Sequence, residues 1–358
     1  MNRTRLWALT LALVTAAACG QPSSAPAPGA APAGQGGAAP TAAAPPASAT
    51  AAPPKELKVA VPTIDLNYML PISVAQAQGF FQQEGVDQQT IEMSTTASTT
   101  ALLNKEVDIA THSGALLAAA QGADARAVFF PYSSSTFQFS VDPNRIKQPR
   151  DLVGQAVGIA SVGNSQDIAT KLMIKDLGVD PLSVNYLPLG GESARIAAMV
   201  SGQIVGAANN PNVAAELKRR GYTVMTNSFK VMPIPWSGYG VHTMYLTERR
   251  PTLEAWMRAM VKSLQFVHQD PDASADIVSR ALDIDRGIAR DSIDALLEVM
   301  SADDPGGATE VGLREWIRVQ KEATPEMRDV TIDEVADVTP LREAQRALGI
   351  QCKNGYKC

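Results

Sequence analysis

The stretch Ala156–Arg195, AVGIASVGNSQDIATKLMIKDLGVDPLSVNYLPLGGESAR, contains two strand–turn–helix units in succession. In the first unit, an apolar run at Ala156–Ala160 leads through the polar turn Ser161–Asp167 into a helical pattern. The second unit repeats this order, with a strand at Val184–Leu189 and a turn at Gly190–Ser193. The first N–H groups of a helix lack partners within the helix and carry partial positive charge. Two parallel strands would bring two such helix starts to one sheet edge, where open α/β sheets bind ligands. The alternative is that the glycines of both turns serve only the turns.

The same alternation of strands and helices is expected in the part of the chain before this stretch. Apolar strands separated by short helical segments are expected at Leu57–Pro62, Gln89–Met93, Val107–Thr111 and Ala125–Phe130. A β-α-β-α-β order with short turns indicates a mostly parallel sheet. Near the end of the chain, apolar residues recur at helical spacing from Leu253 to Val267, and we expect this Met- and Trp-containing stripe to be core.

The sequence predicts two α/β lobes between which the chain passes twice. A run of period-two alternation at Thr136–Val141 ends at Pro143 and Pro149, and we place the first crossing near Phe137–Pro149. The return crossing is expected within Ser228–Leu246, which contains two further prolines. The expected parts are lobe 1 at 55–141 and 236–350 with C-terminal helices, lobe 2 at 142–235, and a tail at 351–358.

The N-terminus has the features of an export signal. Arginines among the first five residues precede the apolar run Leu6–Ala18, which is shorter than the about 20 residues needed to span a bilayer. Small residues then meet Cys19. Residues 1–18 resemble a bacterial lipoprotein signal, which implies cleavage before Cys19 and a lipid on that cysteine. The alternative is a plain secretory signal, and both predict an exported protein.

Residues 19–54 are expected to form a disordered tether. Gln21–Pro54 consists mainly of Ala, Pro, Gly, Ser and Thr, without a charged or large apolar side chain. Such a segment buries too little surface to offset its ordering entropy. Pro keeps it extended and Gly keeps it flexible, so it can hold a folded body away from a membrane.

Composition argues against several classes of function. The net charge is −5 and 19% of residues are charged, without a basic patch, so nucleic acid is not an expected partner. The three histidines lie far apart and no Cys-x-x-Cys occurs, so we expect neither a metal site nor a cofactor. Besides Cys19, the chain has Cys352 and Cys358, which form either a small disulfide loop or two free thiols.

Five segments together resemble the nitrate/sulfonate/taurine-type substrate-binding proteins of ABC importers, a superfamily that includes binding proteins for the thiamine pyrimidine precursor. They are AQAQGFFQQEGVD (Ala75–Asp87), NKEVDIA (Asn104–Ala110), PRDLVGQAVGIA (Pro149–Ala160), LGVDPLSVNYLPLG (Leu177–Gly190) and ARIAAMVSGQIVGAANNP (Ala194–Pro211). The resemblance covers about Leu57 to Leu264. It implies a type II periplasmic-binding-protein fold: two parallel-rich α/β lobes, two crossing segments and a ligand cleft between the lobes. It also implies a small-molecule ligand, an ABC permease and ATPase as partners, and a monomer that closes about a hinge.

Candidate ligand contacts are polar or aromatic residues that follow predicted strands. From lobe 1 they are Asp65, Asn67, Tyr68, Thr96, Ser98, His112, Ser113 and Tyr132. From lobe 2 they are Ser161, Asn164, Ser165, Glu192, Ser193, Asn209 and Asn210, with Trp236 beside the return crossing.

Several candidates have a purely structural alternative. Asp65 can cap the helix that follows it, and Asn164 or Ser165 can do the same. Tyr68 can be half-buried packing, and His112 can be a satisfied turn histidine. Glu192 is of a type common in a helix's first turn, and it would oppose a fully anionic ligand.

Two other functions remain as alternatives. The superfamily includes fungal pyrimidine-precursor synthases, which use a cysteine-rich motif that this chain lacks, and no GxSxG, GxGxxG or GxxxxGK[ST] motif occurs. A ligand-sensing ectodomain is the other alternative. The ligand itself is left open among sulfonates, nitrate, carboxylates and pyrimidines, and the aromatic candidates favour an organic solute over bare nitrate.

Overall fold

The computed structural model describes residues 55–358 of the chain. The expected signal at 1–18, the lipidation site Cys19 and the tether at 19–54 lie outside the described residues. The strands are β1 (Lys55–Val61), β2 (Val86–Glu92), β3 (Ile109–Thr111), β4 (Ala125–Phe129), β5 (Gln138–Val141), β6 (Ala156–Ile159), β7 (Asn185–Pro188), β8 (Gly206–Asn209), β9 (Thr223–Asn227) and β10 (Tyr239–His242).

The α-helices connect and follow these strands. They are α1 (Leu66–Ala77), α2 (Phe80–Gln83), α3 (Thr95–Leu103), α4 (His112–Ala120), α5 (Ser165–Asp176), α6 (Glu192–Val200), α7 (Pro211–Arg219), α8 (Arg250–Gln269), α9 (Pro271–Leu282), α10 (Arg286–Leu297), α11 (Glu310–Ala323), α12 (Ile332–Val335) and α13 (Thr339–Ala347). Across residues 55–358, no helix combines the length and apolar character that a membrane span requires.

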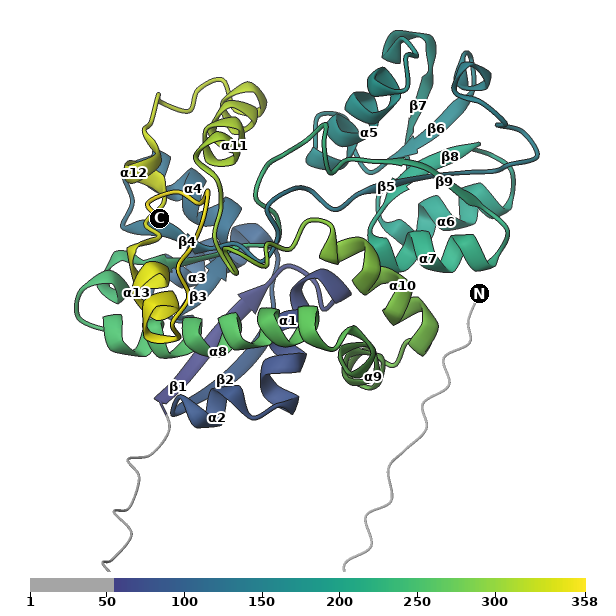
Figure 1. Ribbon diagram of the computed structural model, residues 1–358. Coiled ribbons are helices and arrows are strands. Elements are labelled where there is room, and N and C mark those ends of the chain that lie inside the picture. The colour runs from purple at the N-terminus through teal and green to yellow at the C-terminus, as the bar shows by residue number, and fades with distance from the viewer. Residues whose placement is uncertain (1–54) are drawn as a thin grey trace, which may run out of the picture. The chain divides into compact units, whose positions relative to one another are not determined.

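Two five-stranded sheets carry the two lobes (Figure 1). Their strand orders are β2-β1-β3-β10-β4 in lobe 1 and β7-β6-β8-β5-β9 in lobe 2. In each sheet one strand, β10 or β5, runs antiparallel to both of its neighbours. Each of these two strands follows directly after the chain has arrived from the other lobe, so each crossing ends by inserting a strand into the new sheet.

The expected boundary of lobe 1 at residue 141 is wrong. β5 pairs with β8 and β9 of the second sheet, and Phe139 and Val141 are fully buried in that lobe. The first crossing therefore spans residues 130–137. Alternation at period two correctly indicated a strand here, but a strand's own sequence does not say which sheet accepts it.

The two crossings run side by side and are joined by hydrogen bonds. Residues 130–137 lie against residues 228–238, with Trp236 N donating to Tyr132 O at 3.0 Å and Ser228 N donating to Phe137 O at 2.8 Å. The hydroxyl of Ser134 donates to Met232 O at 3.0 Å. Because backbone bonds link the two crossings, they form one narrow two-stranded connection between the lobes.

The long helix α8 packs in the hydrophobic core of lobe 1. The predicted stripe is confirmed, since Leu253, Trp256 and Leu264 are completely buried. The indole Nε1 of Trp256 donates to Gln88 Oε1 on β2 at 2.8 Å, which satisfies the one polar atom of this buried ring.

The C-terminal helices are not confined to lobe 1. α10 packs against α7 of lobe 2, and Arg219 on α7 lies 3.0 Å from Asp285 at the start of α10. A helical pattern predicts an apolar face but not the element that covers it, so the expected assignment of all C-terminal helices to lobe 1 is corrected here.

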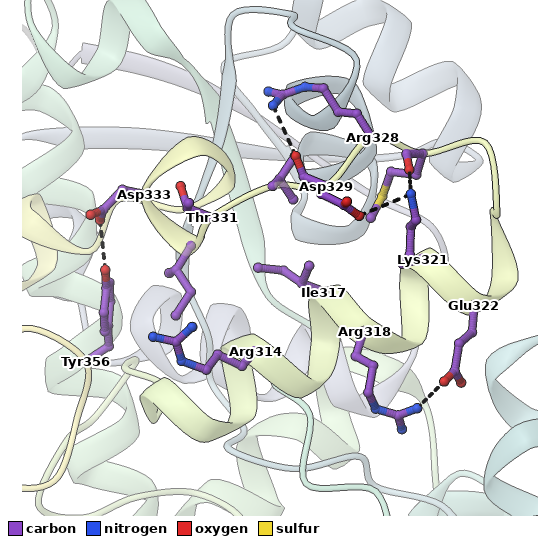
Figure 2. A pocket seen from close by; sticks show the side chains of 13 residues that line it. Arg314, Ile317, Arg318, Lys321, Glu322, Arg328, Asp329, Thr331, Asp333 and Tyr356 are labelled. Atoms are coloured by element: carbon purple, nitrogen blue, oxygen red, sulfur yellow. Dashed lines mark hydrogen bonds and ion pairs between the residues drawn. The ribbon is translucent and has the colours of Figure 1, made fainter.

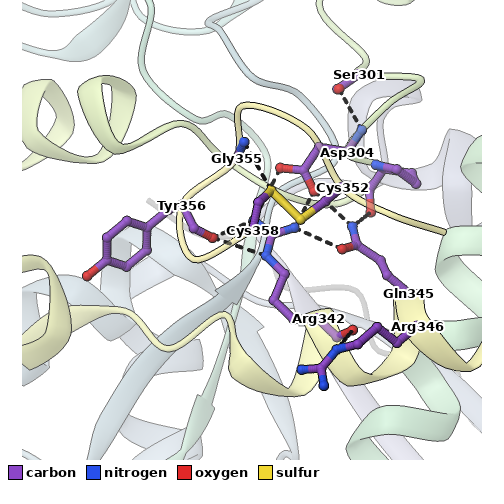
Figure 3. The surroundings of a disulfide bond; sticks show 10 residues. Ser301, Asp304, Arg342, Gln345, Arg346, Cys352, Gly355, Tyr356 and Cys358 are labelled. Carbon is purple, nitrogen blue, oxygen red and sulfur yellow. Dashed lines mark hydrogen bonds and ion pairs between the residues drawn. A yellow bond between two sulfur atoms is a disulfide. The ribbon is translucent and has the colours of Figure 1, made fainter.

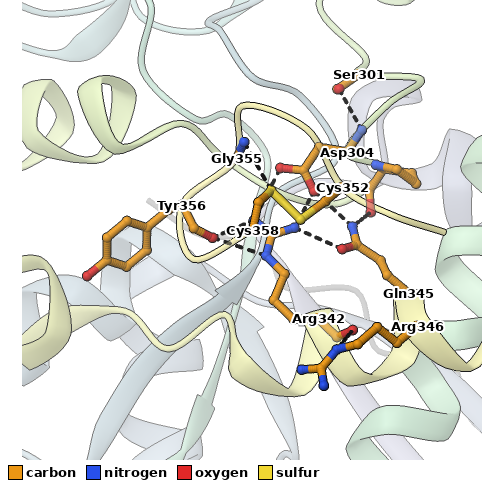
Figure 4. A network of polar contacts seen from close by, with 10 residues as sticks. Ser301, Asp304, Arg342, Gln345, Arg346, Cys352, Gly355, Tyr356 and Cys358 are labelled. Atoms are coloured by element: carbon orange, nitrogen blue, oxygen red, sulfur yellow. Dashed lines mark hydrogen bonds and ion pairs between the residues drawn. A yellow bond between two sulfur atoms is a disulfide. The ribbon is translucent and has the colours of Figure 1, made fainter.

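The tail is held by a disulfide and a buried ion pair. Cys352 and Cys358 are bonded to each other, and the loop they close lies against the side chain of Arg342 (Figure 3). The guanidinium of Arg342 pairs with Asp304 and donates to Tyr356 O at 2.7 Å (Figure 4). Both charged side chains are about 5% exposed. A buried pair of this kind is costly to break, so it fixes α13 to the loop that leads into α11, and the tail is attached through the hydrogen bond from Arg342 to Tyr356 O.

Candidate functional site

A cavity of about 420 Å³ lies between the lobes and beside both crossings. Its size is within the usual range for small-molecule sites. Nine of the expected contact residues line it: Asp65, Asn67, Tyr68, His112, Ser113, Asn164, Ser165, Asn210 and Trp236. The other lining residues are Pro62, Phe137, Gly163, Ile168, Ile234, Pro235, Ser237, Trp316, Val319 and Gln320.

The polar part of this lining follows the central strands of both sheets. In lobe 1, Asp65 comes after β1, and His112 comes after β3. In lobe 2, Asn164 comes after β6, and Asn210 comes after β8. The carboxyl ends of neighbouring parallel strands meet at one edge of a sheet, so each lobe presents two helix starts to the cavity.

Asp65 both caps a helix and lines the cavity. Its carboxylate accepts a hydrogen bond from Tyr68 N at 3.2 Å at the start of α1. Burial raises the pKa of Asp65 to about 7, and the negative charges of Glu192 and Glu92 act in the same direction against the backbone N–H groups. The side chain is nevertheless partly accessible, because it faces the cavity. The ionisation of Asp65 therefore depends on the charge of a molecule bound in the cavity.

Asn67 lines the same cavity and carries an acceptor without a partner. The side chain is 2% exposed, and its Nδ2 donates to Thr136 Oγ1 at 3.3 Å. Its Oδ1 is buried and has no partner among the described residues. A buried acceptor without a partner costs about 1–3 kcal/mol, and a donor on a bound molecule would recover this cost.

His112 is a neutral, packed member of the wall. Gly238 N donates to its Nδ1 at 3.1 Å, and its ring lies 4.9 Å from that of Trp316. Burial lowers the pKa of His112 to about 4, so the ring carries no charge at neutral pH. The alternative expected for His112, a turn histidine that is hydrogen-bonded within the protein, agrees with its bond to Gly238. The ring is also part of the cavity lining.

Carboxylates of the protein already accept hydrogen bonds from N–H groups near the helix starts of lobe 2. Asn164 caps α5 by accepting from Asp167 N at 2.9 Å, while the Asp167 carboxylate accepts from Gly163 N at 2.8 Å. At α7, Asn210 N donates to Glu192 Oε1 at 3.1 Å. The partial positive charge at these two helix starts is therefore largely compensated before any ligand arrives.

Four aromatic rings, from four separate parts of the chain, also line the cavity. Tyr68 comes from α1, Phe137 and Trp236 come from the two crossings, and Trp316 comes from α11. The Phe137 and Trp236 rings meet edge to face at 5.2 Å. Trp316 and its α11 neighbours Val319 and Gln320 were missed by sequence analysis. Trp316 belongs to a helical stripe that reads as core, and it is 1% exposed, so nothing local distinguishes it.

Four expected contacts are not among the lining residues, and their turns follow edge strands. Thr96 and Ser98 begin the helix after β2, and Glu192 and Ser193 begin the helix after β7. β2 and β7 are the outermost strands of their sheets, so these turns lie at the sheet margins. Ser98 is fully buried with its hydroxyl bonded to Thr95 O at 3.0 Å. The expectation that both helix starts of the opening stretch line one wall is thus corrected: α5 does and α6 does not.

Three further expected contacts lie behind or outside the wall. Tyr132 is fully buried, and its hydroxyl donates to Asn67 O at 2.8 Å, so it supports α1 from within. Asn209 is buried at the end of β8, and the next residue lines the cavity instead. Ser161 is exposed outside the lining, which begins at Gly163.

A larger cavity, of about 640 Å³, lies on the other side of α11 (Figure 2). α11, residues 327–333 and Tyr356 surround it. Its charged side chains are paired with one another or with near neighbours: Arg318 with Glu322, and Lys321 with Asp329 at 3.3 Å. Most of these side chains are also about half exposed to solvent. This cavity offers a ligand few unsatisfied groups, despite its size.

Comparison with known proteins gives a family and a fold. The family model described as NMT1/THI5 like matches residues 67–274. The chain has no detectable similarity to the curated protein sequences with which it was compared.

Several solved structures are similar. The periplasmic aliphatic sulphonate-binding protein SsuA from Escherichia coli superposes with a TM-score of 0.64 at 15% identity, covering 79% of this chain and 92% of that one. A ligand-binding component of an ABC-type import system from Staphylococcus aureus, with zinc bound, gives 0.65 at 14% identity, covering 82% and 99%. The desulfurization enzyme DSZB gives 0.59 at 13% identity, covering 82% and 99%. These likenesses establish the type II periplasmic-binding-protein fold, which is the fold expected from the sequence.

Proposed function

This chain belongs to the NMT1/THI5-like family, and on that premise we propose that it is the extracytoplasmic solute-binding protein of an ABC importer. It captures a small organic solute in the cavity between its lobes and delivers it to a permease when the lobes close about the two crossings. The observation that carries this proposal is the inter-lobe cavity, which is lined by turns after the central strands of both sheets. A ligand that touches both lobes favours the arrangement in which they are together.

The narrow connection supports a hinge. Residues 130–137 and 228–238 join the lobes by two hydrogen-bonded strands of chain, and small changes in their backbone angles would rotate one sheet against the other. The contact between α10 and α7 lies outside this connection and would have to slide or separate during such a rotation. Ligand-dependent compaction in small-angle X-ray scattering is the expected sign of closure.

A thermal-shift panel tests solute binding. Sulfonates, nitrate, carboxylates, amines and pyrimidines are each added to the folded protein. A true ligand at 100 times its dissociation constant stabilises the protein by about 2.7 kcal/mol and raises its melting temperature. A folded protein that responds to no class of solute would contradict the proposal.

The proposed location is the outer face of the cytoplasmic membrane, with a lipid on Cys19 and the tether at 19–54 as spacer. The support is the lipoprotein-like signal at 1–18. Labelled fatty acid should enter the wild-type protein and not a Cys19→Ala variant, and that variant should leave the membrane fraction. A Cys19→Ala variant that stays membrane-bound would refute the anchor.

An enzymatic function is the second candidate, because the DSZB enzyme shares the fold. Between residues 20 and 351 this chain has no cysteine, so the inter-lobe cavity holds no thiol nucleophile. Asp65 and His112 both line the cavity, but burial holds His112 neutral and a backbone amide occupies its Nδ1. Recovery of unchanged solute after prolonged incubation is the expected result, and turnover would favour the enzyme.

A further inference from the structure

The inter-lobe cavity contains acceptors and an acid but no basic side chain. Among its lining residues, Asp65 is the one carboxylate, and neither Lys nor Arg is present. Asn67 adds a buried Oδ1 that no donor within residues 55–358 reaches. Asp65 and Asn67 therefore place hydrogen-bond acceptors on the α1 side of the cavity.

Three of the four helix starts that face the cavity are already compensated by carboxylates of the protein, and the start of α4, which has no side-chain cap, is the exception. Asp65 caps α1, Asp167 takes the Gly163 amide before α5, and Glu192 takes the Asn210 amide before α7. Each carboxylate occupies the position that an anionic ligand would take at a helix start.

The cations on the adjoining helices are also engaged. Lys171 on α5 pairs with Asp167 at 2.7 Å, and Arg195 on α6 lies 3.9 Å from Glu192. Neither cation is among the lining residues. At pH 8, above the raised pKa of Asp65, a sulfonate placed in this cavity would meet the Asp65 carboxylate without a compensating positive charge, which is unfavourable at low effective dielectric.

The aromatic walls suit a cation. Tyr68, Phe137, Trp236 and Trp316 surround the cavity from α1, the crossings and α11. The faces of such rings attract a positive charge, Trp most strongly, and the attraction grows when water is excluded. A carboxylate together with several rings forms a site for an organic ammonium or amidinium group.

We propose, on the basis of the solute-binding function, that the inter-lobe cavity takes a small organic amine or amidine cation whose N–H groups are received by Asp65 and Asn67. Simple sulfonates and nitrate are excluded by the same groups. The assignment differs from that of the sulphonate-binding protein with which this chain shares its fold. The difference lies in side chains of the cavity and leaves the fold unchanged.

The electrostatics of Asp65 agree with this assignment. Burial, together with Glu192 and Glu92, raises its pKa to about 7, so Asp65 is a carboxyl group that a bound cation would ionise fully. The other titratable groups that line the cavity, Tyr68 and His112, are neutral there, since burial raises the pKa of Tyr68 and lowers that of His112. A bound cation therefore has one titrating partner.

Matched probes test the ligand class. Benzylamine, benzamidine and butylamine are compared by calorimetry at pH 8 with phenylmethanesulfonate, benzenesulfonate and butanesulfonate, which have similar hydrocarbon parts. We expect binding of at least one cation and of no sulfonate. Lowering the pH from 8 to 5.5 should weaken the binding of that cation about 10- to 30-fold, because Asp65 must then lose a proton.

A charge-removing variant supplies the control. Asp65→Asn keeps a good helix N-cap and removes the charge, so it should weaken cation binding at least tenfold and abolish its pH dependence. Asp270→Asn makes the same change at the N-cap of α9, which is outside the cavity, and should alter affinity less than twofold.

Two outcomes separate this inference from the proposed function. Sulfonate binding that is insensitive to Asp65→Asn would overturn the cation assignment and leave the solute-binding function standing. A folded protein that binds none of these probes and no solute of the wider panel would overturn the solute-binding function, and the cation assignment with it.

Discussion

The two faces of α11 border two different cavities. Trp316, Val319 and Gln320 face the smaller inter-lobe cavity, whereas Ile317, Arg318 and Lys321 face the larger one beside residues 327–333. The larger cavity is lined by charges that neutralise each other near solvent. The smaller one contains a buried unpaired oxygen and a carboxyl group with a raised pKa. Unsatisfied, desolvated groups, and not volume, therefore support the choice of the inter-lobe cavity as the proposed binding site.

The largest expected effect comes from Trp316→Ala on the inter-lobe face. Trp316 is 1% exposed and packs on His112 and Phe130, so its loss should destabilise the protein by about 3–5 kcal/mol in urea unfolding and weaken solute binding. Trp316→Phe is the milder variant, in case Trp316→Ala does not fold. Arg314→Ala, on the exposed other face, should change stability by less than about 0.5 kcal/mol. Equal losses of stability and of solute binding in Trp316→Ala and Arg314→Ala would contradict the distinction drawn between the two cavities.

The double variant Cys352→Ser/Cys358→Ser should perturb only the larger cavity. The disulfide closes a loop across a sequence separation of 6, for which the loss of cross-linking corresponds to about 2 kcal/mol. Tyr356, within that loop, lines the larger cavity. Thermal unfolding should shift downward while solute affinity stays the same. A large loss of affinity would show that the tail acts on the inter-lobe cavity.

The pH dependence of stability should differ between wild type and Asp65→Asn. The pKa of Asp65 is raised from 3.8 to about 7 on folding, so between pH 4 and 7 the folded protein holds more protons than the unfolded one. The stability contributed by this group is therefore full below pH 4 and is lost as the pH rises through 7. Relative to wild type, Asp65→Asn should gain on the order of 3–4 kcal/mol between pH 4 and pH 8, measured by urea unfolding without ligand. Parallel pH profiles for the two proteins would contradict the raised pKa.

The smallest effect is expected from Arg318→Ala in the larger cavity. Arg318 is 53% exposed and pairs with Glu315 and Glu322 along α11. Surface ion pairs of this kind contribute about 0–1 kcal/mol, and less at high salt. Solute affinity should be unchanged. A marked loss of solute binding in the Arg318→Ala variant would indicate that the larger cavity, and not the inter-lobe cavity, binds the solute.

The sequence identified the polar turns after predicted strands but could not tell which of them line the inter-lobe cavity. The turns after β1, β3, β6 and β8 line the cavity, and those after β2 and β7 do not. All of these turns have similar composition, with small residues and helix-capping side chains. They differ in whether the preceding strand is central or at an edge of its sheet, and strand order depends on pairings between segments far apart in the chain.

The sequence by itself determined the α/β rhythm, the stripe of α8 and the double passage between lobes, because periodicity and turn chemistry act over a few residues. Only the tertiary structure decided that β5 joins the second sheet, that α6 starts away from the cavity, and that Trp316 completes its wall. These facts depend on which surfaces meet after the chain has folded. Trp316 reaches His112 across 204 residues of sequence, and no local pattern encodes a contact of that range.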